Sequence, residues 1–227
     1  MKILLVLGAV LSVLGVPQIA LAQGTAPGEM AVRVTEARQA NAALMRQYSW
    51  TSRTEVMLQG QVKDIRIDAV NYGLGGQLQR NTVNDQSAPL PFGFLRRRIA
   101  EAERQQVETY LMGLRDLLEQ YTLPTAGKVQ DFLNKATASG PDASGLFEMS
   151  GPNVVLPGDT FSLWLNPRTR HAQRVQVSTT FQGDPVNLTA TFNTLPSGLN
   201  YVAYAEVTVP AKQISVQVQN FDYLRNN

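Results

Sequence analysis

The sequence of 227 residues contains no cysteine, a single histidine and only 17% charged residues. The absence of cysteine excludes disulfides, cysteine-ligated zinc, iron–sulfur clusters and thiol nucleophiles. One histidine leaves only carboxylates for a metal site, and no acidic cluster has the spacing of a calcium loop. The net charge of +2 lacks the excess typical of a nucleic-acid binder. We therefore expect no metal, no other cofactor and no nucleic-acid partner.

The first 22 residues have the pattern of a signal peptide. Lys2 provides a positive n-region, residues 3–16 form an apolar stretch without charge, and Ala20-Leu21-Ala22 is a cleavage site of the A-x-A type. We expect cleavage between Ala22 and Gln23. Hydrophobic residues make up 44% of the chain, so residues 23–227 suffice for one domain with a buried core.

The same segment predicts the compartment. An uncleaved membrane anchor is the alternative, but Pro17 and Gln18 interrupt the stretch before it reaches the roughly 20 apolar residues of a membrane span. A bacterial lipoprotein signal ends in a cysteine that carries the acyl chains, and this chain has none. The expectation is a soluble protein, periplasmic or secreted and not membrane-anchored.

Hydrophobic periodicity predicts an order of helix, strands, helices and a final run of strands. Helical spacing covers residues 30–48, 95–121 and 129–136, and 84–93 is expected to be a loop. Strand alternation covers 50–57, 65–69, 78–83, 161–165, 175–181, 186–192, 201–209 and 214–218. The pattern does not place the connection over 140–158.

Short turns between successive strands indicate an antiparallel meander, and βαβ repeats are absent. The predicted fold class is therefore α+β, a curved antiparallel sheet or half-open β-barrel with helices on its concave side. Where helices fill that side only in part, the remainder forms an apolar pocket.

No constellation of residues points to catalysis. His171 could act as the base of a Ser-His-Asp hydrolase, but it lies in a basic turn and no Gly-x-Ser-x-Gly elbow occurs. The glycines of 73–76 lack nucleotide-loop spacing and open no helix, so turn glycines are the better interpretation. The expectation is a protein that is not an enzyme.

Large apolar side chains on the sheet and on the long helix are the candidate ligand contacts. Such residues are more often plain core, although aromatic residues on a concave sheet can contact an apolar ligand. The candidates are Trp50, Ile65, Ile67, Leu111, Leu114 and Trp164. The basic run Arg96, Arg97 and Arg98 is a candidate contact for a membrane or partner, although a solvated helix start is the plainer interpretation.

One stretch resembles a known family. Phe161 to Thr169 followed by Gln173 to Val177 is similar to a strand, an Asn-Pro-basic-Thr turn and a returning strand of the periplasmic lipoprotein-carrier superfamily, the outer-membrane lipoprotein-localisation proteins. The signal peptide, the leading helix and the early hairpins fit it as well. The resemblance implies a half-open antiparallel barrel with helices across its mouth, whose hydrophobic interior holds acyl chains.

Two functions remain open at this point. The first is a periplasmic protein that binds lipid or lipoprotein acyl chains in an apolar groove, a property that would suit a carrier. Burying each methylene contributes about 0.8 kcal/mol, so such binding needs apolar surface and no catalytic chemistry. The second is a non-catalytic interaction module of the cell envelope with a closed core and a protein partner. A cavity between the long helix and the sheet distinguishes the first from the second.

Overall fold

The computed structural model describes residues 27–87, 94–122, 125–169 and 171–226, and gives the backbone alone for 27–31, 87 and 94–100. The expected signal peptide and its cleavage site lie outside the described residues. The helices are α2 (Pro27–Met45), α3 (Phe94–Glu119) and α4 (Ala126–Lys135), with 3₁₀ turns η1 (Gln120–Thr122) and η2 (Pro210–Lys212). The strands are β1 (Tyr48–Leu58), β2 (Gln61–Tyr72), β3 (Leu78–Ser87), β4 (Thr137–Ser139), β5 (Phe147–Pro152), β6 (Thr160–Leu165), β7 (Ala172–Phe181), β8 (Asp184–Thr194), β9 (Asn200–Val209) and β10 (Ile214–Arg225).

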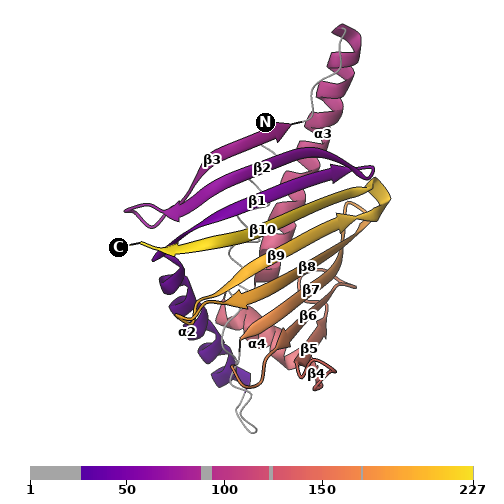
Figure 1. The fold of residues 1–227 in the computed structure, drawn as a ribbon. Helices are drawn as coiled ribbons and strands as arrows, with labels where there is room; N and C mark the ends of the chain where they lie inside the picture. Colours follow the sequence, from indigo (N-terminus) through magenta and orange to yellow (C-terminus); the bar gives the residue numbers. More distant parts are fainter. Residues whose placement is uncertain (1–26, 88–93, 123–124, 170, 227) are drawn as a thin grey trace.

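All ten strands belong to one antiparallel sheet, in the order β3-β2-β1-β10-β9-β8-β7-β6-β5-β4. The first strand of the chain pairs with the last, so that Tyr48 lies opposite Arg225 and Leu58 opposite Ile214. The sheet is open, with β3 and β4 as its edges. The curved antiparallel sheet with helices that the sequence predicts is therefore confirmed (Figure 1).

The helices lie on one face of this sheet (Figure 1). The C-terminal half of α3 supplies Leu111, Leu114 and Leu118, which are at most 1% exposed. They join one hydrophobic cluster with the inward residues of β1 and β5–β10. The N-terminal turns of α3 project beyond the β3 edge of the sheet (Figure 1). None of the described helices combines the length and the apolar composition needed to cross a bilayer.

α2 is attached to the start of β9 by two hydrogen bonds between the Asn41 side-chain amide and the Asn200 backbone. Asn41 Nδ2 donates to the Asn200 carbonyl at 2.8 Å, and the Asn200 backbone N–H donates to Asn41 Oδ1 at 2.9 Å. Below this pair, Met45 packs into a second, smaller cluster around Trp50 and Leu199. α2 also packs against α4. This end of the molecule therefore holds its helices firmly.

In β2 the charged residues, and not the isoleucines, face the helices. Arg66 lies opposite Thr54 and Asp68 opposite Ser52, all four of them buried. Ile65 and Ile67 point to the other face and are only half-buried. The two candidate ligand contacts of this strand therefore lie on the face away from the helices, and the Arg66–Asp68 ion pair, at 2.6 Å, makes burial of the charged side possible.

The sequence pattern misses two short strands: β4, just before the unplaced connection over 140–158, and β5, within it. β4 and β5 extend the sheet beyond β6, with Thr137 opposite Ser150. Short strands with Gly and Pro carry little periodicity, which explains why they are missed. β3 also continues to Ser87, so the predicted loop over 84–93 starts too early.

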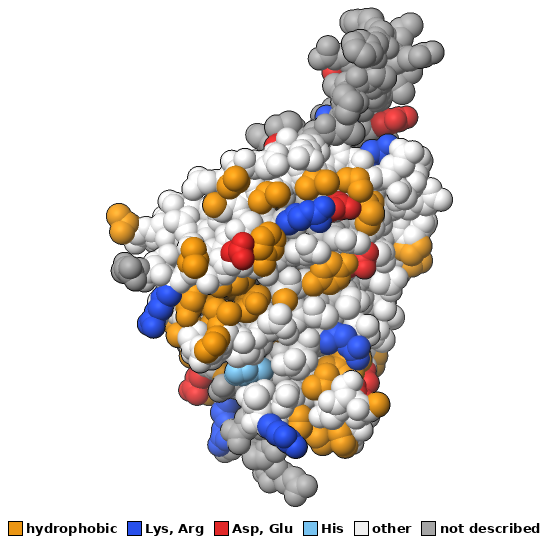
Figure 2. Space-filling model, viewed as in Figure 1, with side chains coloured by type: hydrophobic (Ala, Val, Ile, Leu, Met, Phe, Trp, Pro, Cys, Tyr) orange, Lys and Arg blue, Asp and Glu red, His pale blue; other side chains and the backbone are white. Residues whose placement is uncertain are grey.

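The face of the sheet away from the helices is mixed in character. Figure 2 shows hydrophobic side chains scattered among polar and charged ones over this face. Arg53 pairs with Glu55 there, and the Arg174 guanidinium stacks on Trp164 at 3.9 Å from the ring centroid. This pattern is typical of a sheet face in contact with water.

Candidate ligand-binding site

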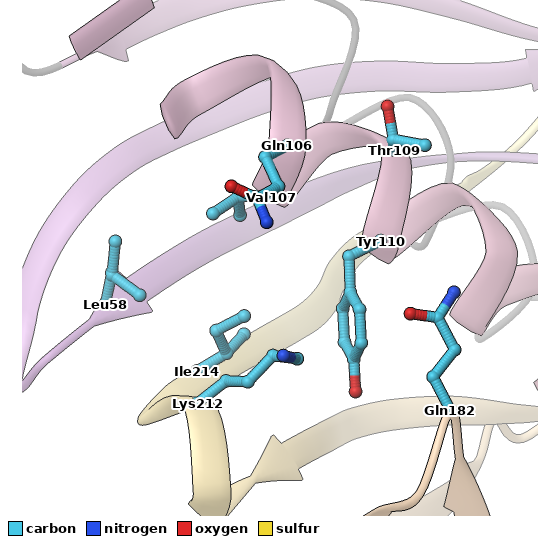
Figure 3. Close-up of a pocket in the computed structure, with 8 residues that line it drawn as sticks. All are labelled: Leu58, Gln106, Val107, Thr109, Tyr110, Gln182, Lys212 and Ile214. Carbon is cyan, nitrogen blue, oxygen red and sulfur yellow. The ribbon is translucent and has the colours of Figure 1, made fainter. Parts of the chain in front are cut away.

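A pocket of about 440 Å³ lies between the middle of α3 and one end of the sheet. Ligand pockets in proteins usually measure about 300–1,000 Å³, so the size is suitable for a small amphiphile. Figure 3 shows Tyr110 reaching from α3 towards the ends of β10 and β7. The pocket is lined by Leu58, Gln106, Val107, Thr109, Tyr110, Gln182, Lys212 and Ile214.

Turns at the ends of the strands form the floor of this pocket. Gln182 and Gly183 both have positive φ, 53° and 85°, and close the β7–β8 hairpin with two residues. Gln213 also has positive φ, 52°, and it redirects the chain from η2 into β10. Both turns bring polar side chains to the end of the sheet, so the pocket combines apolar walls with a polar rim.

The Tyr110 hydroxyl on the rim is positioned by two charged side chains, Asp184 and Lys212. The Tyr110 hydroxyl donates to Asp184 Oδ2 at 3.2 Å, and Lys212 Nζ lies 3.3 Å from the same oxygen. The Lys212 ammonium also lies 4.9 Å from the Tyr110 ring centroid. Burial and the Asp184 carboxylate raise the pKa of Tyr110 to about 12, so its hydroxyl stays a hydrogen-bond donor at neutral pH.

The space between α3 and the sheet is thus open beside Val107 and filled by side chains from Leu111 onwards. From Leu111 onwards the sheet-facing leucines of α3 are at most 8% exposed, whereas Val107, one turn earlier, lines the pocket. Residues 101–106 of α3 are mostly exposed. The cavity that distinguishes the two functional hypotheses is therefore present beside the N-terminal part of the helix and filled beside the C-terminal part.

The structure does not bring the six candidate ligand contacts into one groove. Leu111 and Leu114 are fully buried core residues, one turn away from the pocket. Trp50 lies in the second cluster, stacked on Tyr223 with ring centroids 5.5 Å apart. Neither location tests whether these residues contact a ligand.

The remaining candidates lie elsewhere. Ile65, Ile67 and Trp164 face away from the helices, as their pairing with Glu55, Arg53 and Arg174 shows. The backbone of residues 96–98 belongs to the first turns of α3, but the side chains of this basic run lie outside the described part. The pocket residues Val107, Tyr110 and Lys212 were not singled out from sequence.

His171 belongs to a structural network. Its Nδ1 lies 3.0 Å from Thr194 Oγ1, which also accepts from Asn200 Nδ2 at 3.1 Å. Burial lowers the pKa of His171, which keeps the ring neutral at pH 7. Among the described residues, no three histidine, aspartate or glutamate side chains come together as metal ligands would.

No protein-family model and no curated protein matches this chain. Two solved structures are similar at 8% identity: a DUF1329 family protein from Desulfovibrio piger, with a TM-score of 0.40 over 88% of this chain and 94% of that one, and a LolA superfamily protein from Nitrosomonas europaea, with a TM-score of 0.35 over 83% and 91%. The second carries the name of the superfamily that the sequence resembles.

Proposed function

We propose that this protein binds the acyl chain of a lipid or lipoprotein in the pocket beside Val107, and that it does so in the bacterial cell envelope. The observation that carries the proposal is the pocket of about 440 Å³ between α3 and the sheet. Its walls Leu58, Val107 and Ile214 offer an acyl chain the apolar contact that it lacks in water.

The form of the pocket suits reversible binding. One wall is the part of α3 whose neighbouring turns are mostly exposed, so this wall is bound to the sheet less firmly than the helix beyond Leu111. Outward movement of that half would admit or release a chain without disturbing the packed core. A carrier needs such an element, because uniformly tight binding would prevent release.

The proposed location rests on residues 1–22, whose charge and apolar pattern is that of a cleaved signal peptide. We propose that the mature protein starts at Gln23 in the periplasm or outside the cell. A protein partner in the envelope would receive the cargo; the arginines 96–98 are candidates for that contact.

The test is purification from the periplasmic fraction, N-terminal sequencing and mass spectrometry of extracted lipid. We expect Gln23 as the first residue and lipid at a defined stoichiometry. V107R should reduce the lipid at least about tenfold, because a guanidinium would occupy an apolar wall. Q105R, on an exposed position of the same helix, is the matched control and should leave the lipid unchanged.

Two outcomes would contradict the proposal. One is a wild-type protein that carries no lipid and binds no apolar dye. The other is loss of lipid in Q105R as well as in V107R. A reproducible cross-linked protein partner without any lipid would instead support the closed-core interaction module.

A further inference from the structure

Five buried polar atoms without a hydrogen-bond partner lie on the neighbouring strands β1 and β10. Ser52 is 0% exposed, Thr54 1% and Asn220 3%. Leaving such groups unpaired typically costs about 1–3 kcal/mol each, so a cluster of them calls for an occupant. This polar row consists of Trp50 Nε1, Ser52 Oγ, Thr54 Oγ1, Asn220 Oδ1 and the Tyr223 hydroxyl.

The pairing of the strands places these atoms next to one another. Ser52 lies directly opposite Asn220, and Thr54 is the next residue of β1 on the same face. The Trp50 ring stacks on Tyr223 at the end of the row. Asn220 Nδ2 already donates to the Val202 carbonyl at 2.9 Å, which leaves its Oδ1 as an acceptor directed to the inner face.

The charges beside the row do not select an anion. Arg66 Nε lies 2.6 Å and Arg80 Nη1 3.5 Å from the Asp68 carboxylate, so two guanidinium groups share one partner. Asp85 lies opposite Arg66 in the sheet, and Asp64 precedes it by two residues on β2. The guanidinium charges of Arg66 and Arg80 therefore have carboxylates near them. The polar row can then contribute hydrogen bonds to a ligand, and no net positive charge.

The row needs both donors and acceptors from its partner. Two aliphatic hydroxyls can donate or accept, the indole N–H only donates, and the Asn220 oxygen only accepts. Burial raises the pKa of Tyr223, so its hydroxyl remains protonated. An uncharged group with several hydroxyls satisfies this combination, whereas an ester or a hydrocarbon satisfies it poorly.

The distance to the pocket matches one lipid chain. Leu58 and Ile214 of the pocket lie on the same two strands, four residues from Thr54 and six from Ser52 and Asn220. At about 3.3 Å per residue this is about 13–20 Å. Half of the roughly 30 Å hydrocarbon core of a bilayer, the depth of one leaflet, falls in that range. The positions between them, Val56 and Val216, are apolar but buried in the main core cluster, so a chain can run along them only when α3 moves outward, the movement on which the proposed function depends.

We propose that the polar row binds the uncharged, hydroxyl-bearing head of an amphiphile, such as a glycerol or sugar group, while its chain extends to the pocket. This inference rests on the proposed acyl-chain function and adds the class of head group to it. The polar row then forms one end of the site, and the pocket beside Val107 forms its apolar end.

The experiment compares 1-monooleoylglycerol with methyl oleate. Both are esters of oleic acid; the first carries glycerol with two free hydroxyls, and the second carries a methyl group without any. We expect the wild-type protein to prefer the glycerol ester about tenfold, the effect of roughly one to two net hydrogen bonds. S52A/T54V should bring the two affinities within about twofold and leave methyl oleate unaffected. T51V, on the same strand and the opposite face, should keep the preference.

A second signature separates this role from a merely structural one. Ser52 and Thr54 have no partner without ligand, so S52A/T54V should melt at a higher temperature than wild type, by a few degrees. In W164F the remaining tryptophan is Trp50, and its emission should shift with monooleoylglycerol and not with methyl oleate.

Equal affinity of the wild-type protein for the two probes would overturn the inference and leave acyl-chain binding intact, and it would indicate that water satisfies the row. An unchanged preference in S52A/T54V would overturn it too. If neither probe binds, the proposed function fails with it. Should S52A/T54V not fold, the wild-type ratio and the W164F emission still decide the question.

Discussion

Asp159 is the residue on which the loop before β6 depends. Its Oδ1 accepts from the Val154 N–H at 2.6 Å, and its Oδ2 accepts from the N–H groups of Val155 and Leu156 at 2.9 and 2.6 Å. The Tyr121 hydroxyl donates to the same Oδ2 at 2.6 Å. One carboxylate thus fixes both the loop and the end of α3.

D159N should lower the free energy of unfolding by about 2–4 kcal/mol, because an amide group would turn a donor towards N–H groups that need an acceptor. Urea denaturation at pH 7 measures it. D142N is the matched control: Asp142 caps the N–H groups of Ser144 and Leu146, but it is exposed, so its loss should be about 1 kcal/mol or less. Equal losses would contradict this account.

The same carboxylate predicts an acid dependence. Burial alone would raise the pKa of Asp159, but the hydrogen bonds from Leu156, Tyr121, Val154 and Val155 outweigh it and lower the pKa below the ordinary value. The stabilisation is then complete above the unfolded pKa of about 3.9 and is lost as the pH falls through the folded pKa. Wild type should therefore destabilise more steeply than D159N below about pH 4, as denaturation at several pH values will show.

At Gly113, α3 packs closely against the end of β7. A Cβ built there would lie 2.8 Å from Phe181 Cζ, on the ring that also meets the Tyr110 ring edge-on at 5.0 Å. G113L should force the helix away from the sheet and lower the free energy of unfolding by about 1–3 kcal/mol. Since Tyr110 lines the pocket, lipid binding should weaken too.

Gly127 in α4 provides the control for that substitution. A Cβ at Gly127 has only Thr125 Oγ1 at 4.0 Å as a neighbour. G127A should be neutral or stabilise the protein by up to about 1 kcal/mol through helix propensity. Thermal and urea unfolding of both variants compare their free energies of unfolding with that of the wild type. A G113L variant as stable as the wild type would show that α3 is not closely packed at Gly113.

The elements also show what sequence could predict. Strand and helix periods place eight of the ten strands and all three helices near their observed positions, because alternation is strong wherever one side is buried. Alternation in β2 does not show which side faces the helices, because the Arg66–Asp68 pair buries charge there, which hydrophobicity alone cannot anticipate. The pocket residues come from α3, η2, two strand ends and the β7–β8 turn, and only tertiary structure brings them together.

For the whole molecule, the two ends of the strand order differ in how much they contribute to the core. We call β1–β3 the first wing of the sheet and β4–β9 the second; β10 joins the two. Among the described residues, the main core cluster contains none from β2 or β3, whereas β7 and β8 contribute Val175, Val177, Leu188 and Ala190. We expect amides of β2 and β3 to exchange with solvent at least about tenfold faster than those of β7 and β8, because local opening of the first wing exposes less apolar surface. Hydrogen–deuterium exchange by mass spectrometry measures this, and uniform protection would contradict it.

The pairing of β1 with β10 also sets the order of events during synthesis. Three strands can pair as soon as the first hundred residues are made, and β4 to β9 can pair in succession afterwards, but β10, which joins the two wings, is made last. Until then β1 and β9 both present unpaired edges, which are prone to pair with other chains. Completion of the sheet is therefore a late, long-range step, and the growing chain has to be kept from aggregating while it remains incomplete.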